Sequence, residues 1–428
     1  MSNPIRIGIA GLGTVGAGLI KIIQKNSNIL EARAGKPIKI IAVSALSKSK
    51  DRGVDLTAYE WEDDPIALAK RDDIDVFVEL IGGESGQAKK ATEEAIKHGK
   101  HVVTANKAML AIHGQELASA AENSGVNLRF EAAVAGGIPV IKTLTESLAG
   151  NNITRIMGVM NGTCNYILTR MEDTGLAYEE IFEEANQLGF LEADPNLDVG
   201  GIDAAHKLVL LSSIAYGTQV DFNGAILEGI GRITIEDIKA ASEMGYRIKL
   251  LGVSSLSDSG LSQTMRPCLV PLTSPLAQLN GGTNMIIIEG DAVGQIVLRG
   301  AGAGEGPTAS AVIADILDIA RGINIPVFGQ PANSLIKVPA ISTSVENSFY
   351  LRLNLKDEAG ILAKVSAALA NVGISIDRIR QEGHEKDAAP VIIVTHPTDR
   401  DTLNKAISEI EETSAAIDPP VVLRIESV

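Results

Sequence analysis

The sequence predicts an α/β protein built from a doubly wound parallel sheet, a second α+β unit and a small third module. Residues 1–131 alternate apolar runs of strand length with amphipathic helical stretches, as in parallel βαβ units covered on both faces. The glycine motif Gly11-Leu-Gly13-Thr-Val-Gly16 directly follows the first apolar run and opens a helical stretch. From Phe349 to Leu355, apolar residues alternate with more polar ones, which is the period of a half-buried strand.

In the first unit we expect strands at residues 5–10, 38–44, 76–80, 101–104 and 127–131. Between them, apolar side chains recur at a helical period, at Leu19, Ile22 and Ile23 and at Ala88, Ala91 and Ala95. With 428 residues, 45% of them hydrophobic, the chain is long enough for two to four domains of about 100 to 200 residues. We therefore predict a dinucleotide-binding domain at 1–131, completed by 307–340.

The alternation changes after Pro139, where a second unit at 132–306 begins. Helical stretches at 178–188 and 203–216 precede strand-like runs at 247–254, 285–289 and 295–298. A helix is predicted from Pro307 to Ala320, because proline in a first helical turn forfeits no hydrogen bond.

The third unit, residues 349–428, follows the polar segment 342–348. A strand at 349–355, a helix at 360–372, strands at 374–380 and 391–395, a helix at 400–412 and a strand at 421–425 are expected. This order, β-α-β-β-α-β, is ferredoxin-like. Because the module is complete in itself, no strand of the preceding sheet is expected to come from it.

Composition excludes several classes of protein. The formal charge is −15, with no basic run that could follow a phosphate backbone, so nucleic acid is not an expected partner. The two cysteines, Cys164 and Cys268, have neither a disulfide framework nor a zinc spacing. No charged leader and no uninterrupted apolar stretch long enough to span a bilayer occurs, so we expect a cytoplasmic protein without membrane contact.

The glycine motif predicts a dinucleotide site. Its residues, Gly11, Leu12, Gly13, Thr14, Val15 and Gly16, lie between a strand and a helix, as in Rossmann-like folds. Glycine permits the tight turn, the approach of a pyrophosphate and close packing of helix on strand, with the anion at the helix N-terminus. A plain tight turn is the alternative.

The end of the second strand bears on the choice of coenzyme. NAD-selective sites usually place a carboxylate there, which binds the ribose hydroxyls and repels a 2′-phosphate. Here the segment 43–52 instead carries hydroxyls and the cations Lys48, Lys50 and Arg52. The sequence therefore favours a pocket that accepts NADP, with NAD also possible, unless the segment is simply a basic exposed loop.

Two further segments carry candidate catalytic groups. Lys107 follows the fourth strand of the nucleotide fold, where carboxyl ends of parallel strands line the cofactor crevice. Asp203 and Lys207, in the carboxylate-rich segment that opens at Glu192, are four residues apart and so share one helical face. The alternatives are a solvated lysine and a surface ion pair of little energetic value.

Taken together, these motifs make residues 5–340 similar to a homoserine dehydrogenase, while residues 349–428 resemble an ACT domain, a small-molecule regulatory module. The residues that carry the resemblance are Gly11 to Gly16, Thr104 to Lys107, Glu131 to Pro139, Asn161 to Thr163, Glu192 to Lys207, Gly302 to Ser310 and Leu355 to Leu362. The resemblance implies that residues 132–306 bind substrate, carry catalysis and form the dimer. It also implies NAD(P)-dependent interconversion of L-homoserine and L-aspartate 4-semialdehyde in threonine, methionine and isoleucine biosynthesis.

The resemblance also implies roles for individual residues. Lys207 would be the acid/base at the reacting oxygen, Glu192 and Asp203 would hold the substrate amino group, and Lys107 would lie at the cofactor and reacting centre. A cleft ammonium group suits this chemistry, because it can stabilise a developing alkoxide and donate a proton to it. Gly306 would lie near the nicotinamide, and Leu12, Thr14 and Val15 would contact the phosphates and adenosine.

A monovalent cation, expected to be sodium, is implied as well. Its ligands would be the Glu131 carboxylate and the backbone carbonyls of Val134, Gly136 and Ile138. Oxygen ligands are those that hard cations prefer.

The chain departs from the family pattern at two positions. One is Cys164, and the other is Ala359, where the family usually has proline. The first raises a rival function, because a thiol in an active-site loop could be the nucleophile of an acylating semialdehyde dehydrogenase. A second rival is a catalytically inactive sensor that reports an amino acid through its ACT domain. Lys107 and Lys207 argue against both.

Regulation and assembly follow only from the resemblance. It implies a homodimer or homotetramer and an amino-acid effector, L-threonine, bound near the turn from Asp357 to Leu362. Gly360 would let the ligand approach the backbone there. Deletion of residues 346–428 is expected to leave a dehydrogenase that turns over but ignores threonine.

Overall fold

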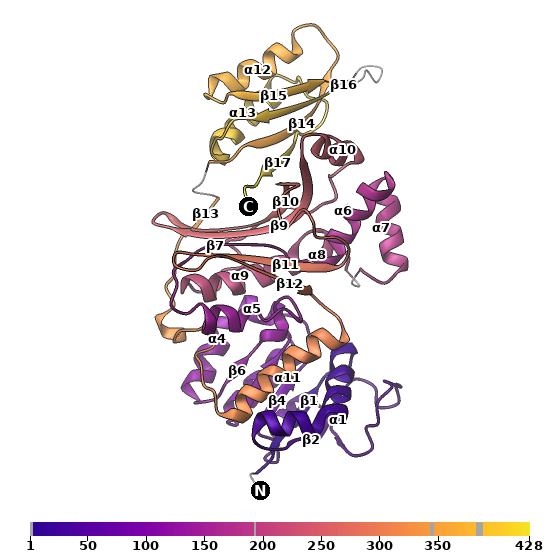
Figure 1. The fold of residues 1–428 in the computed structure, drawn as a ribbon, viewed down its shortest axis with the longest axis vertical. Coiled ribbons are helices and arrows are strands. Elements are labelled where there is room, and N and C mark those ends of the chain that lie inside the picture. The colour runs from indigo at the N-terminus through magenta and orange to yellow at the C-terminus, as the bar shows by residue number, and fades with distance from the viewer. Residues whose placement is uncertain (1–2, 192–193, 343–345, 382–387) are drawn as a thin grey trace.

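The structure is a computed structural model that describes residues 3–191, 194–342, 346–381 and 388–428. Figure 1 shows three units along the long axis, with the N-terminal unit at one end, a long twisted sheet in the middle and the C-terminal module at the other end. Among the residues described, no helix is long and apolar enough to cross a membrane.

The N-terminal sheet is entirely parallel, with the strand order β3-β2-β1-β4-β5-β6. This is the order of dinucleotide-binding Rossmann folds, so the predicted fold class is confirmed. The strands are β1 (Ile5–Ala10), β2 (Ile38–Ser44), β3 (Glu60–Trp61), β4 (Val76–Glu79), β5 (His101–Thr104) and β6 (Leu128–Arg129). The last predicted strand is shorter than expected, because Glu131–Ala133 form a 3-10 turn.

Helices cover both faces of this sheet. The helices of the unit are α1 (Thr14–Ala34), α2 (Pro65–Ala69), α3 (Gln87–Lys97), α4 (Lys107–Asn123) and, from far along the chain, α11 (Glu305–Arg321). Val76 and Val78 pack towards α1 and α11, whereas Phe77 packs towards α2, α3 and α4. Helix α11 begins two residues earlier than predicted and contains Pro307 in its first turn, where the absent N–H costs no hydrogen bond.

The central unit has a mixed sheet with helices packed against it (Figure 1). Its strands are β7 (Ile153–Val159), β8 (Ile226–Leu227), β9 (Tyr246–Ser257), β10 (Gly260–Pro271), β11 (Thr283–Gly290), β12 (Gly294–Ala301) and β13 (Ala340–Ile341). Its longer helices are α6 (Gly162–Thr174), α7 (Tyr178–Gln187), α9 (Ile202–Tyr216) and α10 (Ile235–Glu243). Short turns are α5 (Val140–Lys142), α8 (Asn196–Val199), a π-helical turn at Thr143–Ser147 and a 3-10 turn at Ala332–Ser334.

The C-terminal module has the predicted β-α-β-β-α-β order. Its elements are β14 (Phe349–Lys356), α12 (Ile361–Asn371), β15 (Ile376–Gln381), β16 (Ala388–Thr395), α13 (Arg400–Glu412) and β17 (Val421–Ile425). The strands are ordered β17-β14-β16-β15, and both helices pack on a core of their own. The ferredoxin-like prediction is confirmed.

The prediction that this module adds no strand to the preceding sheet is wrong. Strand β17 pairs in parallel with β10, with Cys268 opposite Arg424 and Leu269 opposite Ile425. One 11-stranded sheet therefore runs from β12 through the central unit to β15. An open strand edge presents unpaired backbone groups, and the alternation of apolar residues along a strand does not reveal which other edge will satisfy them.

A buried ion pair also joins the two units. The carboxylate of Asp237, on α10, is fully buried and accepts hydrogen bonds from the Tyr350 hydroxyl and Arg352 Nε, each at 2.7 Å. The same carboxylate accepts from the backbone N–H of Thr234 at 2.9 Å, which caps α10. The first strand of the module is thus held to a helix of the central unit.

Candidate active site

The loop from Gly11 to Gly16 joins β1 to α1 and is shaped by its glycines. Gly11 has φ +99°, and a Cβ there would lie 2.2 Å from the Leu80 carbonyl oxygen. A Cβ on Gly16 would lie 2.1 Å from the carbonyl oxygen of Gly11, so helix and strand approach too closely for any side chain. Gly13, at the N-cap of α1, faces open space. A phosphate fits at this helix end, where backbone N–H groups are unpaired.

A pocket of about 540 Å³ lies against this loop. It is lined by Gly11, Leu12, Gly13, Ser44, Ala45, Leu46, Ser47, Lys50, Arg52, Asp63, Pro65, Leu80, Ile81 and Gln87. Four predicted cofactor residues (Gly11, Leu12, Gly13 and Arg52) therefore line one cavity. Thr14, Val15 and Gly16 form the start of the adjoining helix α1.

Arg52 ties the glycine loop to the loop after β2. Its Nε donates to the Leu12 carbonyl at 3.0 Å, and its other nitrogens donate to the carbonyls of Lys50 at 2.7 Å and Ser47 at 2.5 Å. The guanidinium also lies over the Trp61 ring, 5.8 Å from its centroid. Nothing in the sequence motif indicated Trp61, because it comes from β3, the outer strand of the sheet.

Gly306 is the second residue of α11, which packs beside α1. No atom lies within 4 Å of the position that a Cβ on Gly306 would take, so its backbone is approachable. Its neighbour Glu305 accepts from Lys21 Nζ at 2.6 Å and fills the space beside Gly18. The start of α11 is thereby fixed next to the first helix of the nucleotide fold.

The structure brings together three predicted residues from two units. Asp203, in the first turn of α9, accepts from Lys107 Nζ at 2.8 Å and from Lys207 Nζ at 2.7 Å. Lys107 is the first residue of α4, directly after the N-cap Asn106, which follows β5 by two residues. Burial acts to raise the pKa of Asp203, but the two ammonium groups outweigh it and hold that pKa well below its ordinary value. Asp203 is therefore a carboxylate that bridges two cations.

Lys207 is the most buried member of this cluster, with 9% of its side chain exposed. Besides Asp203, its Nζ donates to the carbonyl oxygen of Met160 at 2.7 Å. These two acceptors fix the ammonium group in one position. A surface ion pair of little energetic value, the alternative reading of the sequence, does not describe so buried a contact.

Asn161 and Asp198, for which no individual role was predicted, lie beside the cluster. The Asn161 side chain caps α6 by accepting from the Cys164 N–H at 2.8 Å, and its amide donates to Asp198 Oδ1 at 2.9 Å. Both residues are buried. An asparagine directly before a helical stretch is a capping signal that could have indicated the start of α6. Glu192, the other predicted substrate ligand, lies outside the described residues.

Comparisons with known proteins decide the family. Family sequence models match three successive segments, namely the NAD-binding domain of homoserine dehydrogenase at 11–131, homoserine dehydrogenase at 139–317 and the ACT domain at 349–414. The homoserine dehydrogenase of Neisseria gonorrhoeae is 42% identical over 434 residues, which is 100% of this chain and 99% of that protein. The chain belongs to the homoserine dehydrogenase family.

Solved structures agree with this assignment. A homoserine dehydrogenase from Thiobacillus denitrificans is similar with a TM-score of 0.93 at 39% identity, covering 99% of each chain. A hyperthermophilic archaeal homoserine dehydrogenase mutant, in complex with NADPH, has a TM-score of 0.64 at 26% identity. It covers 75% of this chain and 99% of its own. The chain is thus an NAD(P)-dependent oxidoreductase with a C-terminal ACT domain.

The surroundings of Cys164 are those of a structural residue and not of a nucleophile. The thiol is fully buried and donates to the Asp198 carbonyl at 3.2 Å. Burial, with Asp198 and Asp203 nearby, raises the pKa of Cys164 well above its ordinary value. A thiol nucleophile needs the opposite, an accessible group with a lowered pKa, so this geometry argues against the acylating dehydrogenase.

The predicted cation ligands belong to a sharply turning loop between β6 and α5. Ala135 and Gly136 both have left-handed φ angles, +55° and +54°, and a Cβ on Gly136 would lie 2.6 Å from the Gly302 carbonyl oxygen. The Gly137 N–H donates to the Ala301 carbonyl at 3.0 Å. The loop therefore supports the segment that leads into α11 and Gly306.

Two buried carboxyl groups and a lysine lie together in this region. Glu131 and Asp315 are each 2% exposed, and the Glu131 N–H donates to Asp315 Oδ2 at 2.8 Å. Burial and the neighbouring Asp315 raise the pKa of Glu131 to about 8, although Lys142 lies near both. Both carboxyl oxygens of Glu131 accept backbone hydrogen bonds, from Ile141 at 3.0 Å and from Lys142 at 2.9 Å, and a cation bound there would lower the raised pKa. Among the described residues, no cluster of three or more His, Cys, Asp or Glu side chains could hold a metal ion.

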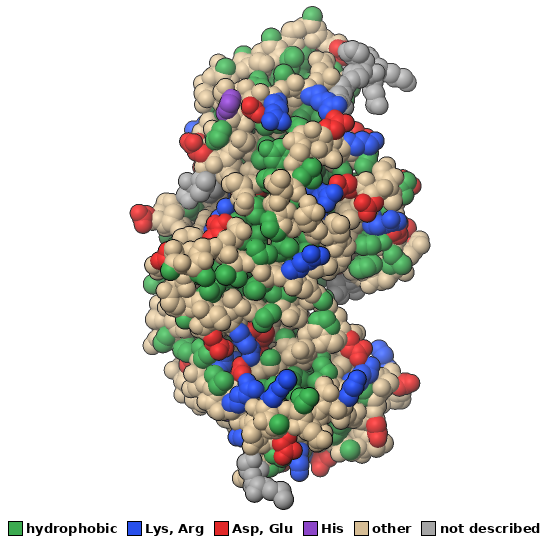
Figure 2. Space-filling view, viewed as in Figure 1, with side chains coloured by type: hydrophobic (Ala, Val, Ile, Leu, Met, Phe, Trp, Pro, Cys, Tyr) green, Lys and Arg blue, Asp and Glu red, His purple; other side chains and the backbone are tan. Residues whose placement is uncertain are grey.

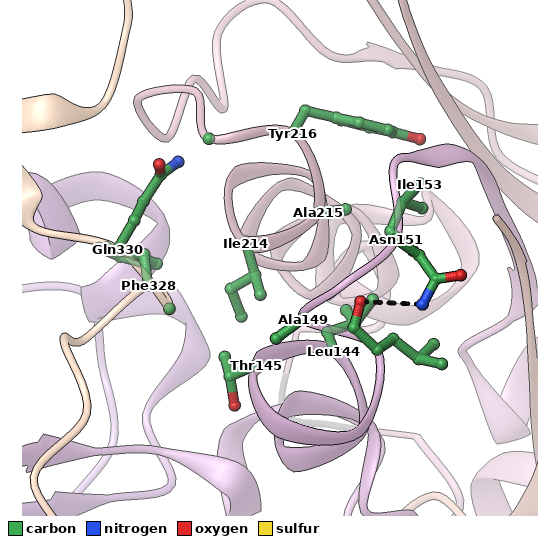
Figure 3. A pocket seen from close by; sticks show the side chains of 13 residues that line it. Leu144, Thr145, Ala149, Asn151, Ile153, Ile214, Ala215, Tyr216, Phe328 and Gln330 are labelled. Atoms are coloured by element: carbon green, nitrogen blue, oxygen red, sulfur yellow. Dashed lines mark hydrogen bonds between the residues drawn. The ribbon is translucent and has the colours of Figure 1, made fainter. Parts of the chain in front are cut away.

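A second pocket, of about 390 Å³, is separate in its lining from the cofactor pocket. Figure 3 shows Thr145, Tyr216 and Gln330 around it, with Asn151 bonded to the Leu148 carbonyl. None of the predicted site residues lines this pocket. It is not part of the candidate active site.

Proposed function

We propose that Lys207 is the acid/base of this dehydrogenase, with Lys107 beside the reacting centre. The observation that supports this most is the bridge Lys107–Asp203–Lys207, in which one carboxylate joins an ammonium at the nucleotide crevice to an ammonium of the central unit. Hydride transfer must occur where cofactor and substrate meet, and this bridge lies between the units that would hold them.

The reaction proposed is the reduction of L-aspartate 4-semialdehyde to L-homoserine, and its reverse. When bound, the reduced nicotinamide supplies the hydride that adds to the aldehyde carbon. The Lys207 ammonium donates a proton to the carbonyl oxygen as negative charge develops there, and Lys107 stabilises that charge. Asp203 and Glu192 would accept from the substrate ammonium group. Asp203 also fixes the two lysines, because its carboxylate contacts both.

The direct test is incubation of the purified protein with L-aspartate 4-semialdehyde and NADPH, followed at the absorbance of the reduced nicotinamide. We expect NADPH oxidation that depends on the semialdehyde, and NADP reduction with L-homoserine. Absence of turnover in both directions, with NADPH and with NADH, would contradict the proposed reaction.

NADPH is proposed as the preferred coenzyme, in accord with the NADPH complex of the archaeal relative. Lys50 lines the cofactor pocket, and the strand before it ends at Ser44 without a carboxylate. Lys50→Glu should therefore lower kcat/KM for NADPH about tenfold more than for NADH, since one charge-assisted contact becomes repulsive. Steady-state kinetics with both coenzymes measure this.

Lys25→Glu, the same charge change on the exposed side of α1, is the matched control and should affect both coenzymes equally. Arg52→Glu should impair NADPH more than NADH but weaken both, because Arg52 also holds the Leu12 carbonyl. An equal response of both coenzymes to Lys50→Glu would show that this loop does not read the 2′-phosphate.

The cation at Glu131 is proposed to be sodium and to be structural. Its ligands would be the Glu131 carboxylate and the carbonyls of Val134, Gly136 and Ile138. Its support is the buried carboxylate pair and the packing of this loop against Gly302. In this position it would fix the start of α11 and contribute no proton to the reaction.

Wider assignments complete the proposal. The nucleotide domain is taken as 1–131 with 307–340, the substrate and dimerisation domain as 132–306, and the regulatory domain as 349–428. The enzyme would act in threonine, methionine and isoleucine biosynthesis in the cytoplasm, as a homodimer or homotetramer. On the face drawn in Figure 2, hydrophobic side chains gather across the middle of the molecule, which supports association through the central unit.

The effector of the ACT domain is proposed to be L-threonine, bound near 357–362. Gly360 has φ +89°, and nothing lies within 4 Å of the position of its Cβ, so a ligand can approach this backbone. We expect Gly360→Ala to weaken threonine inhibition about tenfold, because a methyl group would occupy the approach and displace a hydrogen-bonded ligand. Inhibition curves of the full-length enzyme measure it.

Gly373→Ala is the matched control, since Gly373 has φ +82°, lies in the same module and also faces open space. Both variants carry the same backbone strain, so only a ligand at Gly360 separates them. Equal loss of inhibition in the two variants would place the effector elsewhere.

A further inference from the structure

Two arginines stand on one face of the sheet where the central unit meets the ACT domain. Arg424, on β17, lies between Cys268 of β10 and Phe349 of β14 in the strand register. Arg266, two residues before Cys268 on β10, projects from the same face, because side chains two apart share a face. Arg266 is 9% exposed and Arg424 is 6% exposed.

A third arginine, on helix α13, lies near these two. Arg400 is the first residue of α13, and its guanidinium lies 5.8 Å from the centroid of the Phe349 ring. Burial and the charges of Arg266 and Arg424 lower the pKa of Arg400 to about 10. Burial also lowers the pKa of Arg266, with Arg424 contributing in the same direction. The three positive charges are therefore near enough to act unfavourably on one another.

Acidic groups offset these charges only in part: Glu426 is paired with Arg424, and Glu228 acts on Arg266 and Arg400 by opposing the lowering of their pKa. Glu426 contacts both Arg155 and Arg424, and its oxygen lies 2.5 Å from Arg424 without the alignment of a hydrogen bond. In the part of the chain that the structure describes, no carboxylate forms an ion pair with Arg266 or Arg400. The Nε atoms of Arg266 and Arg424 are buried and have no hydrogen-bond partner there.

This concentration of positive charge is unexpected in a chain with a formal charge of −15. A buried cation without a partner is strongly unfavourable unless something compensates it. The planar guanidinium presents several N–H donors in a fork that matches carboxylate and phosphate oxygens. An anion at this position would be bound by both units at once.

We infer that Arg266, Arg400 and Arg424 form a binding site for a small oxyanion, a carboxylate or phosphate group, at the junction of the catalytic sheet and the ACT domain. The site is distinct from the cofactor pocket and from the proposed threonine site at 357–362. Occupancy would strengthen the attachment of the ACT domain, since the ligand is held from β10, β17 and α13 together.

The test is titration calorimetry of the full-length protein with inorganic phosphate and, separately, with succinate, at constant ionic strength set with chloride. Saturating NADPH is present throughout, so that the cofactor pocket is already filled. We expect one site per chain for at least one of the two anions, and Arg266→Met and Arg400→Met should each weaken it about tenfold or more. The anion that binds more tightly shows whether the site takes a phosphate or a carboxylate group.

Arg299→Met, on the exposed strand β12, removes the same charge far along the sheet and should leave anion binding unchanged. In anion-poor buffer, Arg266→Met should keep or raise the thermal midpoint, because it removes an uncompensated buried charge. An arginine that serves only the fold would instead lower the midpoint in every buffer. Absence of binding by both anions in the unmodified protein, or binding that survives both Met substitutions, would overturn the proposal.

Discussion

Lys207→Ala is expected to lower kcat by about 10² to 10⁴, while NADPH binding stays near its original strength. Lys207 Nζ is held at 2.7 Å by Asp203 and by the Met160 carbonyl, so its proton is presented from one direction. A proton donor is needed only when the alkoxide develops, and the cofactor pocket at Gly11 lies on another unit. The loss should therefore fall on the chemical step.

Three measurements distinguish this from general damage. The dissociation constant of NADPH should be unchanged, the primary isotope effect with deuterated NADPH should increase, and the circular dichroism spectrum should be retained. Lys249→Met is the control, because Lys249 is 1% exposed but, within the described part of the chain, donates only to Asn165 and the Leu279 carbonyl. A Lys207→Ala enzyme that keeps half its turnover would end the assignment of Lys207 as acid/base.

Deletion of residues 346–428 is expected to abolish soluble, folded protein rather than leave an active, unregulated enzyme. The deletion removes β17 and so leaves the β10 edge open at Cys268 and Leu269, a template for aggregation. It also takes the Tyr350 and Arg352 donors from the buried Asp237, which keeps only its hydrogen bonds from Thr234 among the described residues. Loss of one partner of a buried ion pair costs about 3 to 5 kcal/mol, a large part of ordinary stability.

Size-exclusion chromatography and activity per milligram of soluble protein measure this. The control is the full chain with a protease site inserted after Ser342 and then cleaved, which breaks the connection but keeps β17 in place. The cleaved protein should remain intact and active. A deleted protein that is monodisperse and as heat-resistant as the full chain would show that the shared sheet contributes little.

Much of the fold follows from local patterns in the sequence. The strands at 5–10 and 38–44, and the helix at 400–412, match the structure residue for residue, because periodicity and flanking turn residues act over short distances. The glycine motif specified its own loop, since only glycine fits at Gly11 and Gly16. The spacing of Asp203 and Lys207 likewise placed them on one face of α9.

Tertiary structure alone decided which distant groups meet. Lys107 joins Asp203 across two units, Arg52 reaches the Leu12 carbonyl, and β17 completes the edge of β10. No local sequence pattern predicts these contacts. The sequence shows that a side chain or strand edge can form hydrogen bonds, but not which distant group it will bond to. The chemistry of the site could be inferred from the sequence, whereas its assembly depends on the packing of whole units against one another.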